Sequence, residues 1–376
     1  MRIGILTFHR SHNFGAILQA YALYTKLQQE GFDVSIIDYW PDYRKESTSS
    51  FPSYFWSLSF PHKIRALVKY ILTSRSSGIR KRRIMNFICT SFKLEREPRF
   101  INGSDIPNLY DVCIYGSDQI WKKFKLRAFQ GIDKTYFGEF QNKIIYKISY
   151  AASMGVLDLS NDESNSLSNL IENINSISVR EITLKDYLRT FNLEVKLACD
   201  PTFLLNKSDW LNLFSSVKKP GFQYVLYYNI QSSELGKIAS RQIARHFELE
   251  LIEIPQPPIQ NILKSSNPGE AGPIEFLNYI YNAEFVISSS FHGVAFSIIF
   301  EKQFYALGMV NNSDRVLTAL SELKITDRYI NKIEEICLNK SIDYTTVNNL
   351  LSNYKKESFD FLSESLIAAS RITSCN

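Results

Sequence analysis

Residues 284–306, EFVISSSFHGVAFSIIFEKQFYA, constrain the fold of this chain more than any other stretch. Residues 285–287 are a short apolar run with the length and β-character of a buried strand. After a polar turn, residues 294–300 are apolar and numerous enough for a core helix, and residues 304–307 have the pattern of a second strand. The order of strand, turn, helix and strand predicts one βαβ step of a parallel sheet.

The turn before that helix is a candidate anion-binding site. Ser288, Ser289 and Ser290 suit a helix N-cap, and the free N–H groups and positive dipole end of such a helix face the crevice above the strand ends. His292 falls in the first turn, where a neutral imidazole can transfer a proton or bind phosphate. A single histidine at a helix start is also a common structural residue, so both interpretations stay open from the turn alone.

The N-terminal residues predict a second unit of the same type. Residues 2–7 and 34–39 have strand patterns, and residues 16–27 between them repeat with helical periodicity. The first turn contains His9 and Asn13, and polar residues at that position usually line a ligand crevice, although Asn13 also suits the helix cap. The turn lacks the G-x-G-x-x-G spelling, so no dinucleotide site is predicted.

A further candidate loop follows residues 111–115, which have the pattern of a buried strand. Small residues and then Asp118 and Gln119 come directly after this strand, and this order suits a substrate loop. Trp121 suits either stacking on a sugar ring or burial in the core. We therefore expect substrate-binding groups in this loop.

The strand and helix pattern continues beyond this loop. Residues 176–179 read as a strand and lead into Arg180, which suits either a buried ion pair or an anion ligand at a strand end. Residues 200–202, Asp-Pro-Thr, read as a hinge because proline stops regular structure. Strand patterns at residues 224–228 and 249–253 then predict a second sheet.

Composition narrows the class of protein. A chain of 376 residues is too long for one ordinary core and suits two domains, and 45% hydrophobic with 22% charged residues is typical of a soluble enzyme. The net charge of +5 suits an anionic substrate or membrane surface and is too weak to indicate nucleic acid. Five scattered cysteines without a C-x-x-C pair, and the lack of a signal peptide or of a membrane-spanning run, predict a cytoplasmic protein without a metal centre.

A basic segment spans residues 63–83. Its basic residues alternate with apolar ones. They are Lys63, Arg65, Lys69, Arg75, Arg80, Lys81, Arg82 and Arg83. A basic amphipathic helix can lie on an anionic membrane surface, whereas most charge runs are a solvated face. Peripheral membrane contact through this segment is one of the two interpretations.

Several stretches in order along the chain resemble the polysaccharide pyruvyl transferase family, from the first residues to about Arg328. They are GILTF at 4–8, NFGAILQAYAL at 13–23, YGSDQIW at 115–121, SYAASMG at 149–155, SVRE at 178–181, DPT at 200–202 and SFHG at 290–293. The resemblance implies two Rossmann-like domains facing across a cleft, as in glycosyltransferase-B folds. The implied units are residues 1–205 on the acceptor side, residues 206–345 on the donor side, and a terminal helix at 346–376 that packs back on the first domain.

The resemblance also implies an activity, the transfer of pyruvate from phosphoenolpyruvate to two sugar hydroxyls as a cyclic ketal. The product would enter a surface polysaccharide such as an exopolysaccharide or capsule, and the acceptor would be a saccharide or a lipid-linked oligosaccharide at the inner face of the membrane. Phosphoenolpyruvate would be a co-substrate, and no further cofactor or metal is expected.

The residues that match the family motifs take the implied roles. The carboxylate and phosphate of the donor need cations and helix-end N–H groups, and its enol carbon needs an acid. The implied catalytic residues are His292 and Arg180. The implied donor-binding residues are Arg180, Ser290, Phe291, His292, Gly293 and Arg315. The implied acceptor-binding residues are His9, Asn13, Asp118, Gln119 and Trp121.

One position departs from the family pattern. Some relatives have an arginine two residues before the histidine, where this chain has Ser290. Arg315 or Arg328 would have to fold back to the site to replace that anion ligand.

Two other functions stay open from the sequence. The first is a glycosyltransferase that uses a nucleotide sugar. Against it, the second half lacks a clear acidic ribose-binding residue after a glycine-rich turn, and Glu253 is only a partial candidate. The second is a non-catalytic sugar-binding protein. The presence of Arg180, Asp118 and His292 argues against it.

Overall fold

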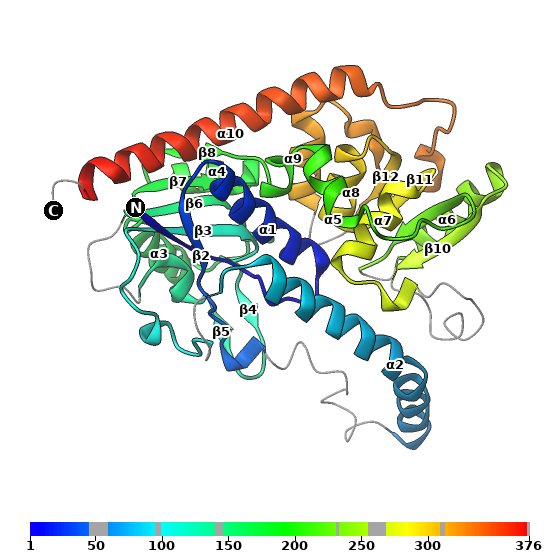
Figure 1. Ribbon diagram of the computed structural model, residues 1–376, viewed down its shortest axis with the longest axis horizontal. Coiled ribbons are helices and arrows are strands. Elements are labelled where there is room, and N and C mark those ends of the chain that lie inside the picture. The colour runs from blue at the N-terminus through cyan, green and yellow to red at the C-terminus, as the bar shows by residue number, and fades with distance from the viewer. Residues whose placement is uncertain are drawn as a thin grey trace.

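The computed structural model describes residues 1–44, 59–94, 99–139, 146–230, 233–254, 268–308 and 313–373. Within these ranges the chain forms two parallel sheets, each with helices against it (Figure 1). The strands of the first sheet end at Leu197 and those of the second begin at Tyr224. Two Rossmann-like α/β units account for this arrangement, which confirms the predicted fold class.

The first sheet has the strand order β2-β1-β3-β6-β7-β8, with parallel pairing throughout. Its strands are β1 (Arg2–Leu6), β2 (Asp33–Ile36), β3 (Val112–Asp118), β6 (Tyr146–Ala152), β7 (Ser176–Val179) and β8 (Val195–Leu197). Its helices are α1 (Phe14–Gln29), α2 (Phe60–Ser91), α3 (Asn161–Ile171) and α4 (Ile182–Arg189), and a small antiparallel pair joins β4 (Phe124–Lys125) to β5 (Gln130–Gly131). Strand β3 is buried over its whole length, as expected for a parallel strand covered on both faces.

The second sheet has the order β10-β9-β11-β12-β13, again with parallel pairs. Its strands are β9 (Tyr224–Tyr228), β10 (Glu250–Ile254), β11 (Phe285–Ser288), β12 (Gln303–Leu307) and β13 (Tyr329–Ile330). The helices of this half are α5 (Lys207–Phe214), α6 (Glu234–His246), α7 (Pro273–Asn282), α8 (Phe291–Ile299) and α9 (Ser313–Glu322). The predicted strand, turn, helix and strand at 284–306 are therefore β11, α8 and β12.

Most predicted strands lie within a few residues of the observed ones, and four short strands were missed, which are β4 and β5 of the antiparallel pair and β8 and β13 of the parallel sheets. Strand β8 has only three residues and includes an exposed lysine, and β13 has only two. Runs this short show no periodicity that a sequence pattern can reveal.

Aromatic packing joins the two halves. The Phe14 ring at the start of α1 lies 5.3 Å from the Phe276 ring of α7. Trp210 of α5 is 5.8 Å from Tyr21 of α1 and 4.9 Å from Phe296 of α8, measured between ring centroids. The start of α1 is therefore held against the helices of the second half.

The last helix, α10 (Tyr344–Thr373), crosses from the second half to the first (Figure 1). It packs on β6 and α9, and its Ser358 hydroxyl accepts a hydrogen bond of 2.8 Å from the backbone N–H of Cys199. The helix thus ties both sheets together.

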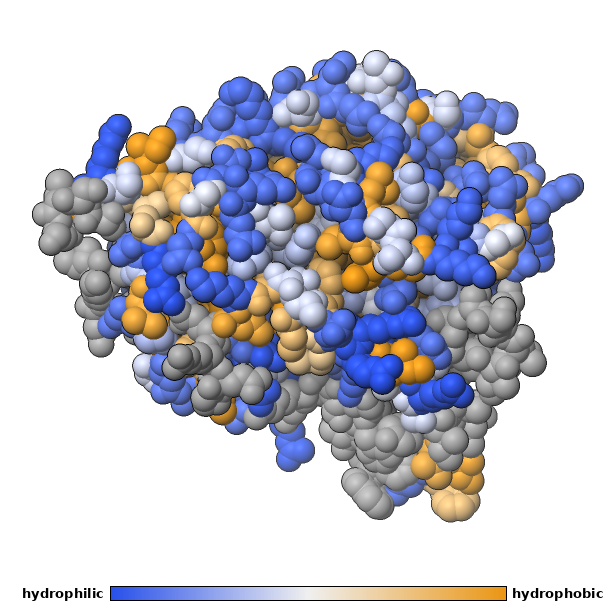
Figure 2. Space-filling view, viewed as in Figure 1, coloured by the Kyte–Doolittle hydropathy of each residue, from blue (hydrophilic) through white to orange (hydrophobic). Residues whose placement is uncertain are grey.

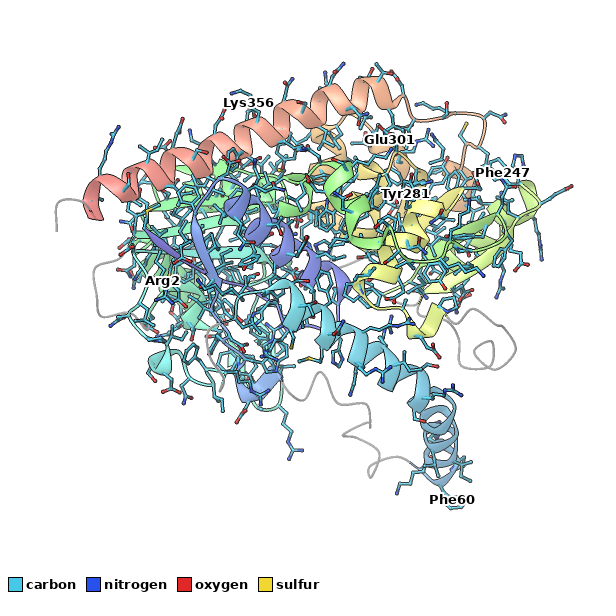
Figure 3. All side chains as sticks on the ribbon, viewed as in Figure 1. Arg2, Phe60, Phe247, Tyr281, Glu301 and Lys356 are labelled. Atoms are coloured by element: carbon cyan, nitrogen blue, oxygen red, sulfur yellow. The ribbon has the colours of Figure 1, made fainter. Side chains whose placement is uncertain are left out.

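The view in Figure 2 is mostly hydrophilic with scattered hydrophobic residues, as is usual for a folded protein. The first turns of helix α2 project from the body of the molecule. Phe60 lies at the projecting end (Figure 3). In the part of the chain that the structure describes, no helix is long and apolar enough to cross a membrane.

Candidate functional site

The turn between β11 and α8 is built by serine hydroxyls. The Ser288 hydroxyl accepts a hydrogen bond of 3.0 Å from the Ser290 N–H and donates one of 3.1 Å to the Ser290 carbonyl. Ser289 Oγ accepts from the N–H of Ile230 at 3.2 Å. Ser290 occupies the N-cap, but its hydroxyl makes no capping bond within the described ranges, so the predicted capping by that side chain is wrong. Instead Ser288 holds the turn.

Two glycines allow the close packing around His292. A Cβ atom on Gly293 would lie 2.1 Å from the Ser288 hydroxyl, and a Cβ atom on Gly15 would lie 2.0 Å from His292 Nδ1. The imidazole therefore rests directly on the first turn of α1. His292 is only 2% exposed, and its Nε2 atom lies 3.6 Å from Asp200 Oδ2.

A buried charged cluster lies against the histidine. Arg180 forms an ion pair with Asp200, and its guanidinium is 3.6 Å from Asp118 Oδ1 and 4.7 Å from the Phe291 ring centroid. Arg315 approaches the same Asp118 oxygen at 3.5 Å. These residues come from the ends of β3 and β7, from the segment after β8, and from the starts of α8 and α9, so the cluster joins both halves of the molecule.

The charges in this cluster fix the protonation of its carboxylates. Burial alone would raise the pKa of Asp200, but Arg180 and His292 outweigh it and hold that pKa well below its usual range. Burial likewise opposes ionisation of Asp118, and Arg180 and Arg315 still lower its pKa. Burial raises the pKa of the neighbouring Glu181, against the opposing charges of Arg180 and Arg315. The cluster therefore contains two firmly ionised carboxylates.

Polar bonds hold the ends of β1 and β3 in place. Gln19 donates a hydrogen bond of 2.8 Å to the Thr7 hydroxyl, and its side-chain oxygen accepts from the Ser117 N–H at 3.3 Å. Ser117 in turn donates to Asp200 Oδ2 at 3.4 Å. Gln19 lies in the family-like stretch at 13–23, so this stretch positions the loop that carries Asp118.

A pocket of about 220 Å³ opens beside the cluster. Of the predicted site residues, it is lined by Asn13, Asp118, Gln119, Ser290, Phe291, His292 and Arg315. The wall also includes Phe8, Ser11, Arg44, Lys122, Ile230 and Ser289. The structure thus brings together side chains from both halves that are far apart in sequence.

Four predicted ligands are not among the residues that line this pocket. Trp121 is fully buried, donates its indole N–H to the Tyr136 carbonyl at 3.2 Å and stacks on Phe137, so the predicted sugar stacking by Trp121 is wrong. His9 is fully buried, and its Nε2 atom lies 2.8 Å from Asp38. The described wall of the pocket does not include Trp121, His9, Arg180 or Gly293.

The remaining predicted residues are also accounted for. Asn13 caps α1 by accepting from the Gly15 N–H at 3.0 Å, which confirms the predicted cap, and it also lines the pocket. Arg315 lies at the pocket, whereas Arg328 is buried elsewhere and donates to the Lys340 carbonyl at 2.5 Å. The basic residue that comes to the pocket near Ser290 is therefore Arg315.

Two cations of the pocket wall were missed. Arg44 lies 3.5 Å from the centroid of the Phe8 ring and 4.9 Å from that of Trp40. Lys122 is half-buried, and burial, followed by the charge of Arg44, lowers the pKa of its amino group. Lys122 follows the family-like stretch at 115–121 by one residue, which is a signal for it, whereas nothing around Arg44 in the sequence marks it.

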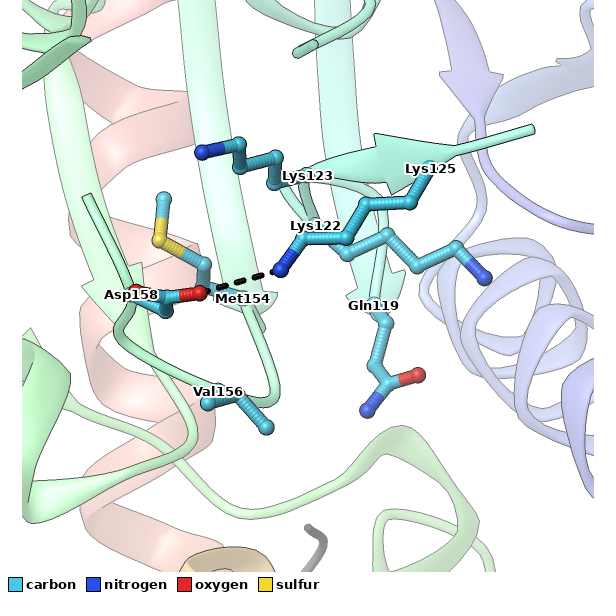
Figure 4. Close-up of a pocket in the computed structure, with 7 residues that line it drawn as sticks. All are labelled: Gln119, Lys122, Lys123, Lys125, Met154, Val156 and Asp158. Atoms are coloured by element: carbon cyan, nitrogen blue, oxygen red, sulfur yellow. Dashed lines mark hydrogen bonds and ion pairs between the residues drawn. The ribbon is translucent and has the colours of Figure 1, made fainter. Parts of the chain in front are cut away.

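A second pocket of about 330 Å³ adjoins the first, and Gln119 and Lys122 line both. Its other lining residues are Lys123, Lys125, Met154, Val156 and Asp158. Lys125 pairs with Asp158 at 3.1 Å, and the amino group of Lys122 points away from that pair (Figure 4). The two pockets together form a basic trough. Among the described residues, no group of three or more His, Cys, Asp or Glu is placed to hold a metal ion.

The family model for polysaccharide pyruvyl transferases matches residues 13–309 of this sequence. The chain belongs to this family. No curated protein shows significant similarity to it.

Solved structures with similar folds include nucleotide-sugar enzymes at low identity. UDP-GlcNAc 2-epimerase from Methanocaldococcus jannaschii is 12% identical, covers 93% of this chain and 93% of its own, and has a TM-score of 0.47. The Neisseria meningitidis UDP-GlcNAc 2-epimerase is 10% identical over 98% of this chain and 100% of its own, also with a TM-score of 0.47. An ADP-heptose heptosyltransferase II from E. coli is 10% identical over 94% and 99%, with a TM-score of 0.34.

Proposed function

We propose that this polysaccharide-modifying transferase moves pyruvate from phosphoenolpyruvate to two hydroxyls of a sugar as a cyclic ketal, in the biosynthesis of a surface polysaccharide such as an exopolysaccharide or capsule. The observation that carries the proposal is the pocket in which His292 at the start of α8 meets Arg315, Lys122 and Arg44, in a chain that belongs to this family. No metal or further cofactor is part of the proposal.

The donor fits the charge of this pocket. Phosphoenolpyruvate has a carboxylate at one end and a phosphate at the other, and each needs charge-assisted hydrogen bonds. Arg315, Lys122 and Arg44 supply three cations around about 220 Å³, and the first turn of α8 adds backbone N–H groups and its positive dipole end. The donor would therefore lie between the first turn of α8 and these cations.

His292 would supply the proton. His292 is one of the residues that line the pocket, and within the described ranges its buried Nε2 atom has no hydrogen-bond partner. Proton transfer to the methylene carbon of the donor makes a methyl group and leaves an oxocarbenium-like centre at C2. One sugar hydroxyl adds there and gives its proton back to His292. The C2–O bond to phosphate then breaks, and the second hydroxyl adds at C2 and gives its proton to the departing phosphate, which closes the ketal. Asp200, 3.6 Å from Nε2 and ionised, would stabilise the imidazolium form of His292 between these steps.

Arg180 would act on the reaction indirectly, through the buried cluster, because it is not part of the described wall of the pocket. It is 2% exposed and paired with Asp200 and Asp118, so its charge is balanced inside the cluster. We assign it as a positioning residue that keeps Asp200 ionised next to His292, and this replaces the direct donor contact that the resemblance implied.

The acceptor would enter from the adjoining pocket. That pocket shares Gln119 and Lys122 with the donor site, so a sugar in it would have its hydroxyls next to the donor carbon. The acceptor would be a saccharide or a lipid-linked oligosaccharide. Since lipid-linked sugars are assembled at the inner face of the cell membrane, this location, in the cytoplasm, is part of the proposal.

Calorimetry with phosphoenolpyruvate and with a UDP-sugar tests the proposal. Binding of phosphoenolpyruvate, with phosphate release when acceptor glycans are added, is the expected result. If a nucleotide sugar binds and phosphoenolpyruvate does not, a glycosyltransferase activity replaces the proposal. If neither binds with acceptor glycans present, the pocket has a non-catalytic sugar-binding role.

A further inference from the structure

Helix α2 has an unusual charge. Its 32 residues contain eight of the basic residues of the chain and neither Asp nor Glu. The chain as a whole has 43 basic and 38 acidic residues, so everything outside this helix has more acidic than basic residues. The positive net charge of the protein therefore comes from α2.

The structure divides α2 into two parts. In its second part, Ile84, Phe87 and Ile88 are buried in the core. Arg83 pairs with Glu275 at 3.2 Å and donates to the Glu270 carbonyl at 2.9 Å. These residues fix the helix to the body, so the Arg83 charge already has a partner within the protein.

The first part is different, because it projects from the body with Phe60 at its end (Figures 1 and 3). Phe60 is 77% exposed, Ile64 49% and Leu67 45%. Their spacing of four and then three residues puts them on one side of the helix. The hydrophobic patch at this end is visible in the space-filling view (Figure 2).

The same side of α2 becomes basic toward the body. Continuing the helical spacing from Leu67 leads to Arg75 and Arg82, and both are exposed. We call Phe60, Ile64, Leu67, Arg75 and Arg82 the α2 face. Apolar residues at the far end and cations nearer the body match the order of acyl chains and phosphate headgroups in a lipid leaflet.

We propose that the α2 face docks the protein on an anionic lipid bilayer. The three apolar side chains would enter the boundary between headgroups and acyl chains, and Arg75 and Arg82 would lie among the lipid phosphates. The structure excludes part of the basic segment from this contact, since Arg83 is tied to α7 and Arg80 lies 4.8 Å from the Phe14 ring at the join of the two halves. Docking does not depend on which reaction the pocket performs.

Sedimentation with vesicles tests this inference directly. The full chain is mixed with vesicles of phosphatidylcholine alone or with one third phosphatidylglycerol, at low and high salt. We expect binding to the anionic vesicles that weakens as salt rises, because headgroup attraction is screened. The triple change Phe60→Ser, Ile64→Ser and Leu67→Ser should weaken binding by about tenfold or more, since the apolar contact is lost.

A matched triple change controls for the loss of exposed apolar groups in general. Ile238→Ser, Ile367→Ser and Ile372→Ser remove side chains that are 51%, 53% and 45% exposed on α6 and α10. Binding of this variant should equal that of the unchanged protein. Arg75→Gln with Arg82→Gln is an independent variant that should weaken binding and reduce its dependence on salt.

Several results would overturn the inference. One is the absence of binding to anionic vesicles, and another is equal binding to neutral ones. Equal losses in the two triple variants would show that the α2 face is not the contact. Full binding by the α2 triple variant, or by the variant without Arg75 and Arg82, would likewise place the contact elsewhere.

Discussion

Arg180 and Arg315 lie near the same carboxylate and have different surroundings. Both approach Asp118 Oδ1, Arg180 at 3.6 Å and Arg315 at 3.5 Å. Arg180 is also paired with Asp200 inside the protein, whereas Arg315 forms part of the pocket wall. Two arginines in one cluster can therefore have separate roles, one in holding the fold and one in binding a ligand. His292 lies between these two regions and connects them.

The largest expected effect is that of His292→Asn. Asparagine keeps a similar size and one hydrogen bond but cannot transfer a proton, so turnover should fall by about 10²–10⁴-fold. Phosphoenolpyruvate binding should largely remain, because the cations of the pocket wall are unchanged. Phosphate release measures the first quantity and calorimetry the second. A loss of turnover smaller than about tenfold would remove His292 from the acid–base role.

The next largest effect tests whether the buried Arg180 stabilises the fold, separately from the role of the pocket. Arg180→Met removes the arginine that is ion-paired with Asp200 in the interior, and breaking a buried ion pair costs about 3–5 kcal/mol of unfolding free energy. Urea unfolding followed by circular dichroism measures it. Lys237→Met is the control, because it removes an ion pair with Glu234 that is largely exposed, and unfolding should not change measurably. If Arg180→Met unfolds like the unchanged protein, the buried pair does not hold the fold.

Arg315→Met should affect donor binding more than the stability of the fold, the opposite of what we expect for Arg180→Met. Loss of a charge-assisted contact should raise the dissociation constant of phosphoenolpyruvate by about 10–100-fold. Arg328→Met is the matched control, since Arg328 is also a buried arginine but lies at the Lys340 carbonyl and not at the pocket. The control should lower stability without changing donor affinity. Equal donor affinities in the two variants would contradict the role of Arg315.

The start of α8 was the most predictable part of the site. The apolar runs of β11 and α8 and the serine turn between them fix the position of His292 through local pattern alone. The burial of Trp121 could not be predicted from the sequence, because a tryptophan after a strand end suits a ligand site and a core equally well. Only the packing on Phe137 and the bond to Tyr136 decide it.

The partners of charged side chains were harder to predict from the sequence than the helices and strands. Its position at the end of a strand predicts that Arg180 lies near the crevice, and it does. The same pattern does not predict that Asp200, which belongs to another segment, forms an ion pair with Arg180. Arg44 reaches the pocket with a contact to Phe8, which is distant in sequence, as well as one to its near neighbour Trp40. Partners of this kind depend on tertiary packing and leave no periodic signal in the sequence.

The smallest effect concerns pH and tests how the buried cluster is balanced. The pKa values of Asp200 and Asp118 are lowered in the folded protein, so their contribution to stability is present above the unfolded value of about 3.9 and is lost as pH falls below it. In Arg180→Met the main charge that lowers the pKa of Asp200 is gone, so that pKa should rise relative to the unchanged protein, while His292 still lowers it. Protonation of Asp200 on acidification removes an unpaired buried charge, so the stability penalty of Arg180→Met should shrink as pH falls from 7 toward 4.

Glu181 is present in both proteins, and since Arg180 also lowers its pKa, it changes the penalty in the same direction. Urea unfolding of both proteins across this pH range measures the difference, and a penalty that stays constant with pH would show that Arg180 does not balance these carboxylates.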